Sequence, residues 1–125
     1  MTARKREKLQ HVATAEELVI PGDLTNDFDR ERIVDSTLKH YGAVDILINN
    51  AGVGMYSAAW QTPMVQAREL FDLNFFAVLD MSQRLIPPLR EGKRGFIVDV
   101  GSSTGKIPLS SFTPHSVSML TPGVL

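Results

Sequence analysis

Polar and glycine residues gather at three points of the sequence, each directly after a short apolar run. Gly22-Asp23 follow ELVIP, Asn49 to Gly52 follow VDILI, and Gly101 to Ser103 follow GFIVDV. Amide, carboxylate and hydroxyl groups can hold a polar ligand, and glycine lets a ligand or a neighbouring backbone come close. If the apolar runs are parallel strands, these residues lie beyond the carboxyl ends of the strands, where ligands of α/β proteins bind.

The elements that must position these residues alternate between strand and helix patterns. The three apolar runs, 17–21, 44–48 and 95–100, predict short buried strands. One helix is predicted from about 25 to 40, and a longer one from 63 to about 86 that ends before Pro87-Pro88. A strand, helix, strand, helix, strand order is typical of a parallel sheet with helices on its faces.

The composition of the chain argues against several classes of protein. With 125 residues, a net charge of −1 and no cysteine, the sequence predicts a single domain, 1–125, without disulfides or thiolate sites, and no metal site is expected. So neutral a chain has no general reason to bind nucleic acid or anionic lipid. The longest purely apolar run, 75–79, is too short to span a membrane, and no export signal follows the basic start. A cytoplasmic location is therefore expected.

The ordered set of motifs resembles the classical short-chain dehydrogenase/reductase family. Asp23-Leu24, the NNAG at 49–52, Asn74 in the long helix and Ser102 after the third run match the family pattern, over about residues 3–118. The resemblance implies a Rossmann-type fold that binds NAD or NADP and moves hydride between an alcohol and a carbonyl. Because a fold does not by itself define a function, each residue also has a structural interpretation.

The same resemblance implies which residues contact the cofactor. Asp23 and Leu24 are expected there, with the Asp23 carboxylate at the adenine ring, together with Asn50, Ala51 and Gly52 beside the cofactor. The competing interpretation of Asp23 is a turn residue that caps a helix. The Asn50 amide can also tie adjacent strands together, so both roles stay open for this segment.

Asn74 and Ser102 are the candidate catalytic residues. Asn74 falls on the apolar stripe of the long helix, where a buried amide must find partners. The resemblance implies that it helps to hold a water in a proton relay, and a helix kink is the structural alternative. Ser102 matches the family's substrate-orienting serine, whose hydroxyl can donate to a developing oxyanion. An ordinary turn serine is the alternative.

The family's acid–base pair is replaced in this chain. The resemblance implies a Tyr and, one helical turn later, a Lys, at the positions of His115 and Met119. Neither tyrosine of the chain has a lysine four residues further on. Imidazole can exchange a proton near neutral pH, but Met119 brings no charge to tune it. His115 is therefore interpreted as a surface histidine.

The front and the end of the family pattern are not found in these 125 residues. The glycine-rich turn that seats a pyrophosphate would precede Met1, and the pattern is lost after Ser118. The predicted fold class is α/β: a partial Rossmann-type parallel sheet with flanking helices, without the first two strands and the C-terminal part. In the order 3-2-1-4-5-6, strand 44–48 loses a neighbour. Either strand 17–21 pairs with it, or a strand is borrowed, or the chain does not fold stably alone.

Two functions follow from these observations. The first is a truncated member of the family, related to NAD(P)-dependent oxidoreductases and inactive as this chain. The second is a non-catalytic interaction module, because the family uses the helix matching 63–86 between subunits. Its partner would be a second copy of the chain or a full-length relative.

Overall fold

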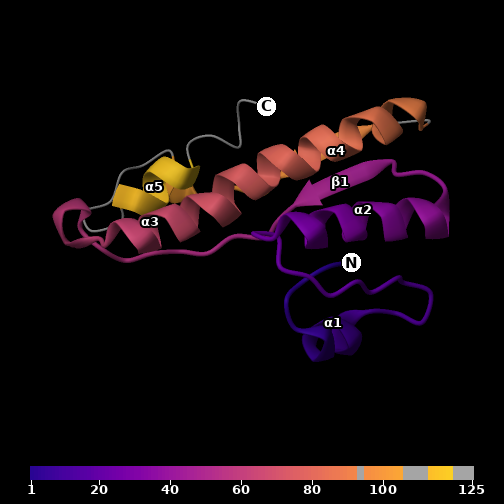
Figure 1. Cartoon of the computed structure of the whole chain (residues 1–125), viewed down its shortest axis with the longest axis horizontal. Helices are drawn as coiled ribbons and strands as arrows, with labels where there is room; N and C mark the ends of the chain where they lie inside the picture. Colours follow the sequence, from indigo (N-terminus) through magenta and orange to yellow (C-terminus); the bar gives the residue numbers. More distant parts are fainter. Residues whose placement is uncertain (93–94, 106–112, 120–125) are drawn as a thin grey trace. The chain divides into compact units, whose positions relative to one another are not determined.

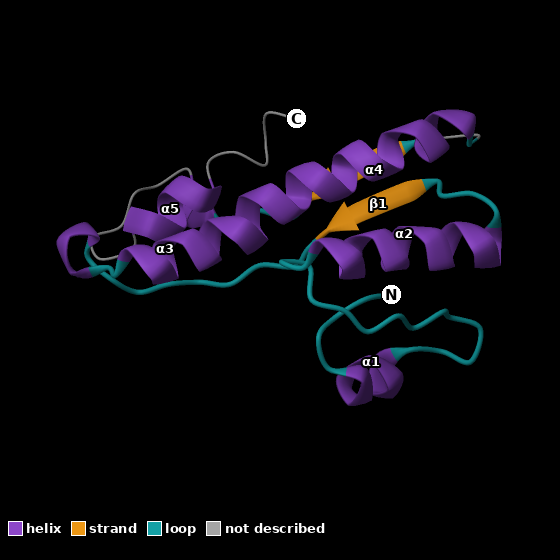
Figure 2. Ribbon diagram, viewed as in Figure 1, coloured by secondary structure: helices purple, strands orange, loops and turns teal. Residues whose placement is uncertain are grey.

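The computed structural model describes residues 1–92, 95–105 and 113–119 and has an α/β fold (Figures 1 and 2). The chain divides into two compact units, Met1–Leu47 with Met81–Phe96, and Ile48–Asp80 with Ile97–Leu125. The predicted loss of the family pattern after Ser118 falls largely on residues 120–125, outside the described residues. The elements, in chain order, are α1 (Arg6–Val12), α2 (Asp27–Tyr41), β1 (Ile46–Asn49), the 3-10 turn η1 (Ala59–Gln61), α3 (Met64–Phe71), the π turn η2 (Asp72–Phe76), α4 (Ala77–Glu91), β2 (Phe96–Asp99), the 3-10 turn η3 (Ser103–Gly105) and α5 (Thr113–Met119).

The sheet of the described residues consists of β1 and β2, which run parallel. The Phe96 N–H donates to the Asp45 carbonyl at 3.0 Å, and the Val100 N–H donates to the Asn49 carbonyl at 2.9 Å. Both hydrogen bonds advance in the same chain direction, as parallel pairing requires. The predicted α/β fold with a parallel sheet and flanking helices is thus confirmed.

Burial alternates along β1. Leu47 is buried, while its neighbours Ile46 and Ile48 are exposed. On β2, Phe96, Ile97 and Val98 are all exposed, so the prediction of a buried strand at 95–100 was wrong. Successive side chains of a strand point to opposite faces of a sheet, so β1 has one covered and one exposed face, whereas both faces of β2 carry exposed apolar side chains.

The predicted strand at 17–21 is not a strand of this sheet, so that prediction was wrong. The segment lies extended beside the first residues of the chain. The Met1 amino group donates to the Leu18 carbonyl at 2.8 Å, the Ile20 N–H donates to the Met1 carbonyl at 3.0 Å, and the Gly22 N–H donates to the Ala3 carbonyl at 3.1 Å. The segment is therefore paired with the first residues of the chain and is not part of the sheet that β1 and β2 form.

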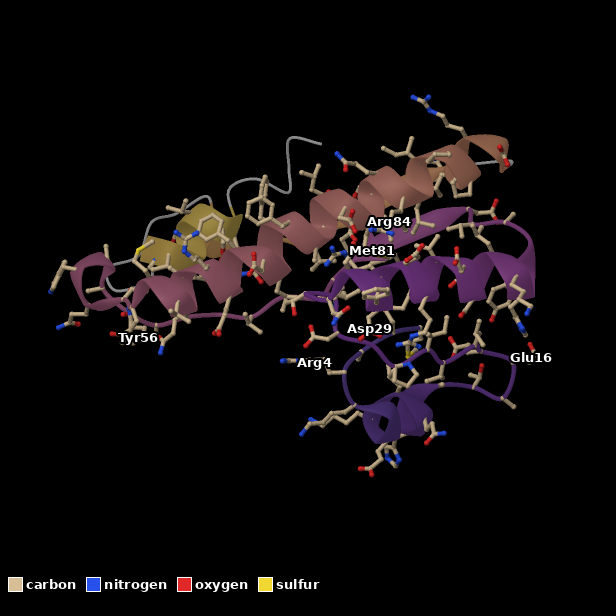
Figure 3. The ribbon with its side chains drawn as sticks, viewed as in Figure 1. Arg4, Glu16, Asp29, Tyr56, Met81 and Arg84 are labelled. Carbon is tan, nitrogen blue, oxygen red and sulfur yellow. The ribbon has the colours of Figure 1, made fainter. Side chains whose placement is uncertain are left out.

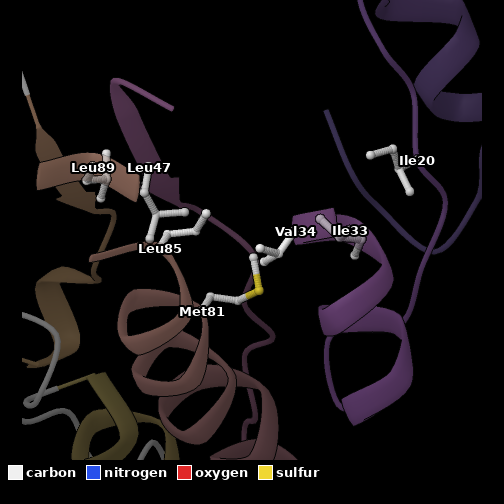
Figure 4. Packing of buried hydrophobic residues seen from close by; sticks show 7 residues of the cluster. All are labelled: Ile20, Ile33, Val34, Leu47, Met81, Leu85 and Leu89. Atoms are coloured by element: carbon white, nitrogen blue, oxygen red, sulfur yellow. The ribbon is translucent and has the colours of Figure 1, made fainter. Parts of the chain in front are cut away.

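The core of the first unit is formed mainly by side chains of α2, α4 and β1. Figure 4 shows Met81 and Leu85 of α4 directed toward Leu47 of β1 and Val34 of α2. Leucine and isoleucine side chains of this size each contribute about 1.5–3 kcal/mol when fully buried. The cluster consists of Ile20, Ile33, Val34, Leu47, Met81, Leu85 and Leu89.

Local sequence signals predict the ends of α2 well and the end of α4 poorly. The Asn26 side chain accepts from the Asp29 N–H and caps α2, and Gly42 ends it with φ +77°, close to the predicted bounds of about 25 to 40. By contrast, α4 continues to Glu91 through Pro87 and Pro88, so the predicted end before Pro87 was wrong. Leu85 and Leu89 on either side of the prolines are both buried in the core, and this packing outweighs the lost backbone hydrogen bonds.

Candidate functional site

Asn74 lies in a π turn between α3 and α4. The Asp72 N–H still donates to carbonyls of α3, but the Ala77 N–H reaches back five residues to the Asp72 carbonyl. One extra residue is thereby fitted into the turn, a feature that is frequent at functional sites. The prediction of a buried amide on the helix stripe is confirmed, because Asn74 is 2% exposed.

The Asn74 side chain holds the loop that follows β1. Its Oδ1 accepts from the Val53 N–H at 2.9 Å, and its Nδ2 donates to the Val53 carbonyl at 2.9 Å. The second Nδ2 hydrogen is directed to Ser118, whose Oγ lies 3.1 Å from Nδ2. Both donors of the amide are therefore used within the protein.

Helix α5 carries the two positions at which the family resemblance implies Tyr and Lys. It packs against α3, η2 and η3 within the second unit (Figure 1). His115 is 8% exposed, so its interpretation as a surface histidine was wrong. Residues 115, 118 and 119 share one face of a helix.

Met119 lies against Gly52. A Cβ added to Gly52 would be 3.3 Å from Met119 Cε and 3.3 Å from Asn74 Oδ1. A side chain at position 52 would therefore crowd both residues, which explains a glycine here on packing grounds. The structure thus brings Gly52, Asn74, His115 and Met119 into one neighbourhood of the second unit.

Asn50, Ala51 and Ser102 complete the candidate residues of this unit. Asn50 and Ala51 are exposed in the loop after β1, and Ser102 is half-buried after β2. Asn49, one residue earlier, donates from Nδ2 to Asp99 Oδ1 at 2.8 Å and so ties β1 to β2. The amide that joins the strands is therefore Asn49, where the sequence suggested Asn50.

Asp23 and Leu24 lie in the first unit, in the turn before α2. Asp23 Oδ1 accepts from the Thr25 N–H at 3.0 Å and from the Thr25 hydroxyl at 2.8 Å. The Thr25 N–H, the Thr25 hydroxyl and, more weakly, the positive charge of Arg4, which is labelled in Figure 3, hold the pKa of Asp23 below its usual value. Asp23 is thus a turn residue in this structure, and one of its carboxylate oxygens is committed to that turn.

Comparison with known proteins identifies the family. Residues 1–119 match the sequence pattern described as short chain dehydrogenase. The chain belongs to the short-chain dehydrogenase family. As in other α/β proteins, the loops after β1 and β2 are where a short-chain dehydrogenase fold would bind its ligand.

Individual short-chain dehydrogenases resemble nearly all of this chain. It is 34% identical to 11-beta-hydroxysteroid dehydrogenase-like 2 of Arabidopsis thaliana, over 94% of this chain and 41% of that protein. A short-chain dehydrogenase structure from Streptomyces avermitilis matches with a TM-score of 0.88 and 30% identity, over 95% of this chain and 45% of that one. A metagenomic short-chain oxidoreductase solved in complex with NADP matches with a TM-score of 0.87 and 27% identity, over 94% and 57%. The chain therefore spans about half the length of these short-chain dehydrogenases.

Sequence reasoning missed the contribution of Val53 and Ser118 to the site. Helical spacing placed Ser118 on the face of His115 and Met119, and this was the available signal. Nothing in the sequence marks Val53, because it contributes only backbone groups.

Among the helices that the structure describes, none is both long and apolar enough to cross a bilayer.

Proposed function

We propose that this chain is a short-chain dehydrogenase-family protein that does not turn over a substrate by itself. The observation that carries the proposal is the pair of side chains at positions 115 and 119. Proton transfer to a reacting oxygen requires an acid of suitable pKa within hydrogen-bond reach. The uncharged thioether of Met119 lies against Gly52 and cannot raise the acidity of a neighbour as an ammonium group would.

We derive no hydride-transfer step, because His115 and Met119 stand where the family resemblance implies the Tyr and Lys that exchange the proton. Both hydrogens of the Asn74 amide are directed to protein oxygens, and one oxygen of Asp23 is committed to Thr25. NAD or NADP remains the cofactor class that the family suggests.

A fluorescence titration with NADPH tests this proposal directly. We expect no saturable binding at NADPH concentrations up to about 1 mM. A dissociation constant of about 1 mM would correspond to a binding free energy of about −4 kcal/mol. In parallel, NADPH-dependent reduction of a simple ketone is expected to stay at the rate of a buffer control. Turnover by the unchanged chain that disappears in His115→Phe would contradict the proposal and indicate a histidine-based enzyme.

A groove on α3 and η2 favours a second candidate function, an interaction module. The groove has a volume of about 410 Å³ and is lined by Met64, Ala67, Arg68, Phe71, Asp72 and Phe76. Met64 and Phe76 are strongly exposed. Arg68 and Asp72 lie four residues apart, so two antiparallel copies of this face could pair each charge with its opposite. We propose a second copy of this chain as the partner.

Sedimentation at micromolar concentration distinguishes the interaction module from a lone domain. We expect the unchanged chain to form a dimer and Phe76→Glu to shift it to monomer, because a charge in the groove would lose its hydration without a partner. Phe28→Glu is the matched control, since Phe28 is 81% exposed on α2 in the other unit. A monomeric unchanged chain, or equal effects of both variants, would contradict a dimer through this groove.

A further inference from the structure

The Asn74 amide and the Ser118 hydroxyl join three segments that are far apart in the sequence. Val53 belongs to the loop after β1, Asn74 to the π turn, and Ser118 to α5. Asn74 and Ser118 are 2% and 0% exposed. Removing one partner of such a buried hydrogen bond costs considerable stability, because the remaining polar group is left without a partner and without water.

The hydrogen bonds run in one connected chain. Asn74 both accepts from and donates to the Val53 backbone, each at 2.9 Å, and its Nδ2 also donates to Ser118 Oγ at 3.1 Å. The Ser118 hydroxyl then donates to the carbonyl of His115 at 2.9 Å. Every step from the loop to the backbone of residue 115 is therefore a hydrogen bond with normal geometry.

The end of this chain of hydrogen bonds coincides with the imidazole of His115. A Cβ added to Gly54, in the loop that Asn74 holds, would be 4.0 Å from Cε1 of His115. The loop after β1 and the imidazole of His115 therefore lie close together. The hydrogen bonds of Asn74 and Ser118 hold α5 against this same loop. This loop follows the carboxyl end of β1, where ligands of parallel sheets bind.

We propose that Asn74 and Ser118 are positioning residues: together they hold α5 on the loop after β1 and thereby place the side chain of residue 115 beside Gly54. Asn74 fixes the loop through hydrogen bonds to the N–H and the carbonyl of Val53. Ser118 connects Asn74 to the backbone of residue 115 through its hydroxyl. The role is independent of whether this chain binds a cofactor or turns over a substrate.

Amide hydrogen exchange measured by NMR tests the proposal, with the Val53 N–H as reporter. Ser118→Ala is expected to speed Val53 exchange about tenfold relative to the Val100 N–H, and Asn74→Ala is expected to speed it further. Val100 belongs to the same unit and donates to Asn49, so a general loss of stability would move both amides together. If Asn74→Ala does not fold, Ser118→Ala decides alone.

The chain offers a matched control and a rescue. Ser116 is also buried on α5, and within the part of the chain that the structure describes its hydroxyl has no hydrogen-bond partner. Ser116→Ala should therefore leave Val53 exchange unchanged, while Ser118→Thr keeps the hydroxyl and should restore most of the protection. Equal effects of Ser116→Ala and Ser118→Ala, or unchanged Val53 exchange in Ser118→Ala, would overturn the proposal.

A second readout follows residue 115 itself. The chain has three histidines, so the Hε1 signals of His11 and His40 serve as internal references. Ser118→Ala is expected to shift the His115 signal and to leave the other two in place. A His115 signal that does not move would show that Ser118 does not position the imidazole.

Discussion

Replacement of Leu85 by alanine is expected to lower the free energy of unfolding by about 2–5 kcal/mol. Leu85 is 5% exposed and packs in the cluster that joins α4 to Leu47 of β1 and Val34 of α2. Truncation removes the transfer free energy of the lost methyl and methylene groups. It also leaves a cavity that a close-packed core fills only in part.

The measurement is urea denaturation followed by far-ultraviolet circular dichroism, with Ile86→Ala as the control. Ile86 is the next residue of the same helix but is 37% exposed. Its truncation should cost clearly less, within about 1 kcal/mol, because less apolar area returns to water. Equal losses in the two variants would show that Leu85 is not packed as described.

Gly95→Ala is expected to destabilise the first unit by about 1–3 kcal/mol, as overpacking does. A Cβ at position 95 would lie 2.6 Å from the Leu89 carbonyl oxygen and 3.1 Å from its carbonyl carbon. These are backbone atoms of α4, so they cannot rotate away as the end of a flexible side chain could. Relief of the clash would require the connection into β2 to shift.

Gly101→Ala is the matched control for this substitution. Nothing lies within 4 Å of a Cβ placed at Gly101. The control should be neutral, or stabilising by up to about 1 kcal/mol, because alanine restricts the unfolded chain. The midpoint of thermal unfolding compares the two variants. A Gly95→Ala midpoint equal to that of Gly101→Ala would contradict the close approach of Leu89.

Local signals predicted much of the fold. Asn26 and Gly42 mark the ends of α2 because capping and a left-handed C-cap are local interactions. The two parallel strands were predicted from apolar runs, although most side chains of these runs are exposed in the structure. Asn74 was singled out because an amide on an apolar stripe requires partners, and its hydrogen bonds to Val53 supply them.

The errors arose where tertiary contacts override local preference. Segment 17–21 has the composition of a strand, but it lies beside residues 1–3 and outside the sheet that β1 and β2 form. Pro87 predicts a helix end, yet packing of Leu85 and Leu89 carries α4 onward. The burial of His115 depends on which segments meet α5, and that information is not contained in a seven-residue helix.

The exposed apolar residues of the two strands have a consequence for the behaviour of this chain in solution. Ile48, Phe96 and Val98 are each 44% or more exposed, and each strand of the described sheet has a neighbour on one side only. A free strand edge beside apolar side chains is a template on which further extended chains can add. Such growth is open-ended, unlike a closed dimer. We therefore expect open-ended association of this chain as its concentration rises, and Ile48→Lys should reduce it, because a charged side chain beside a strand edge opposes further pairing.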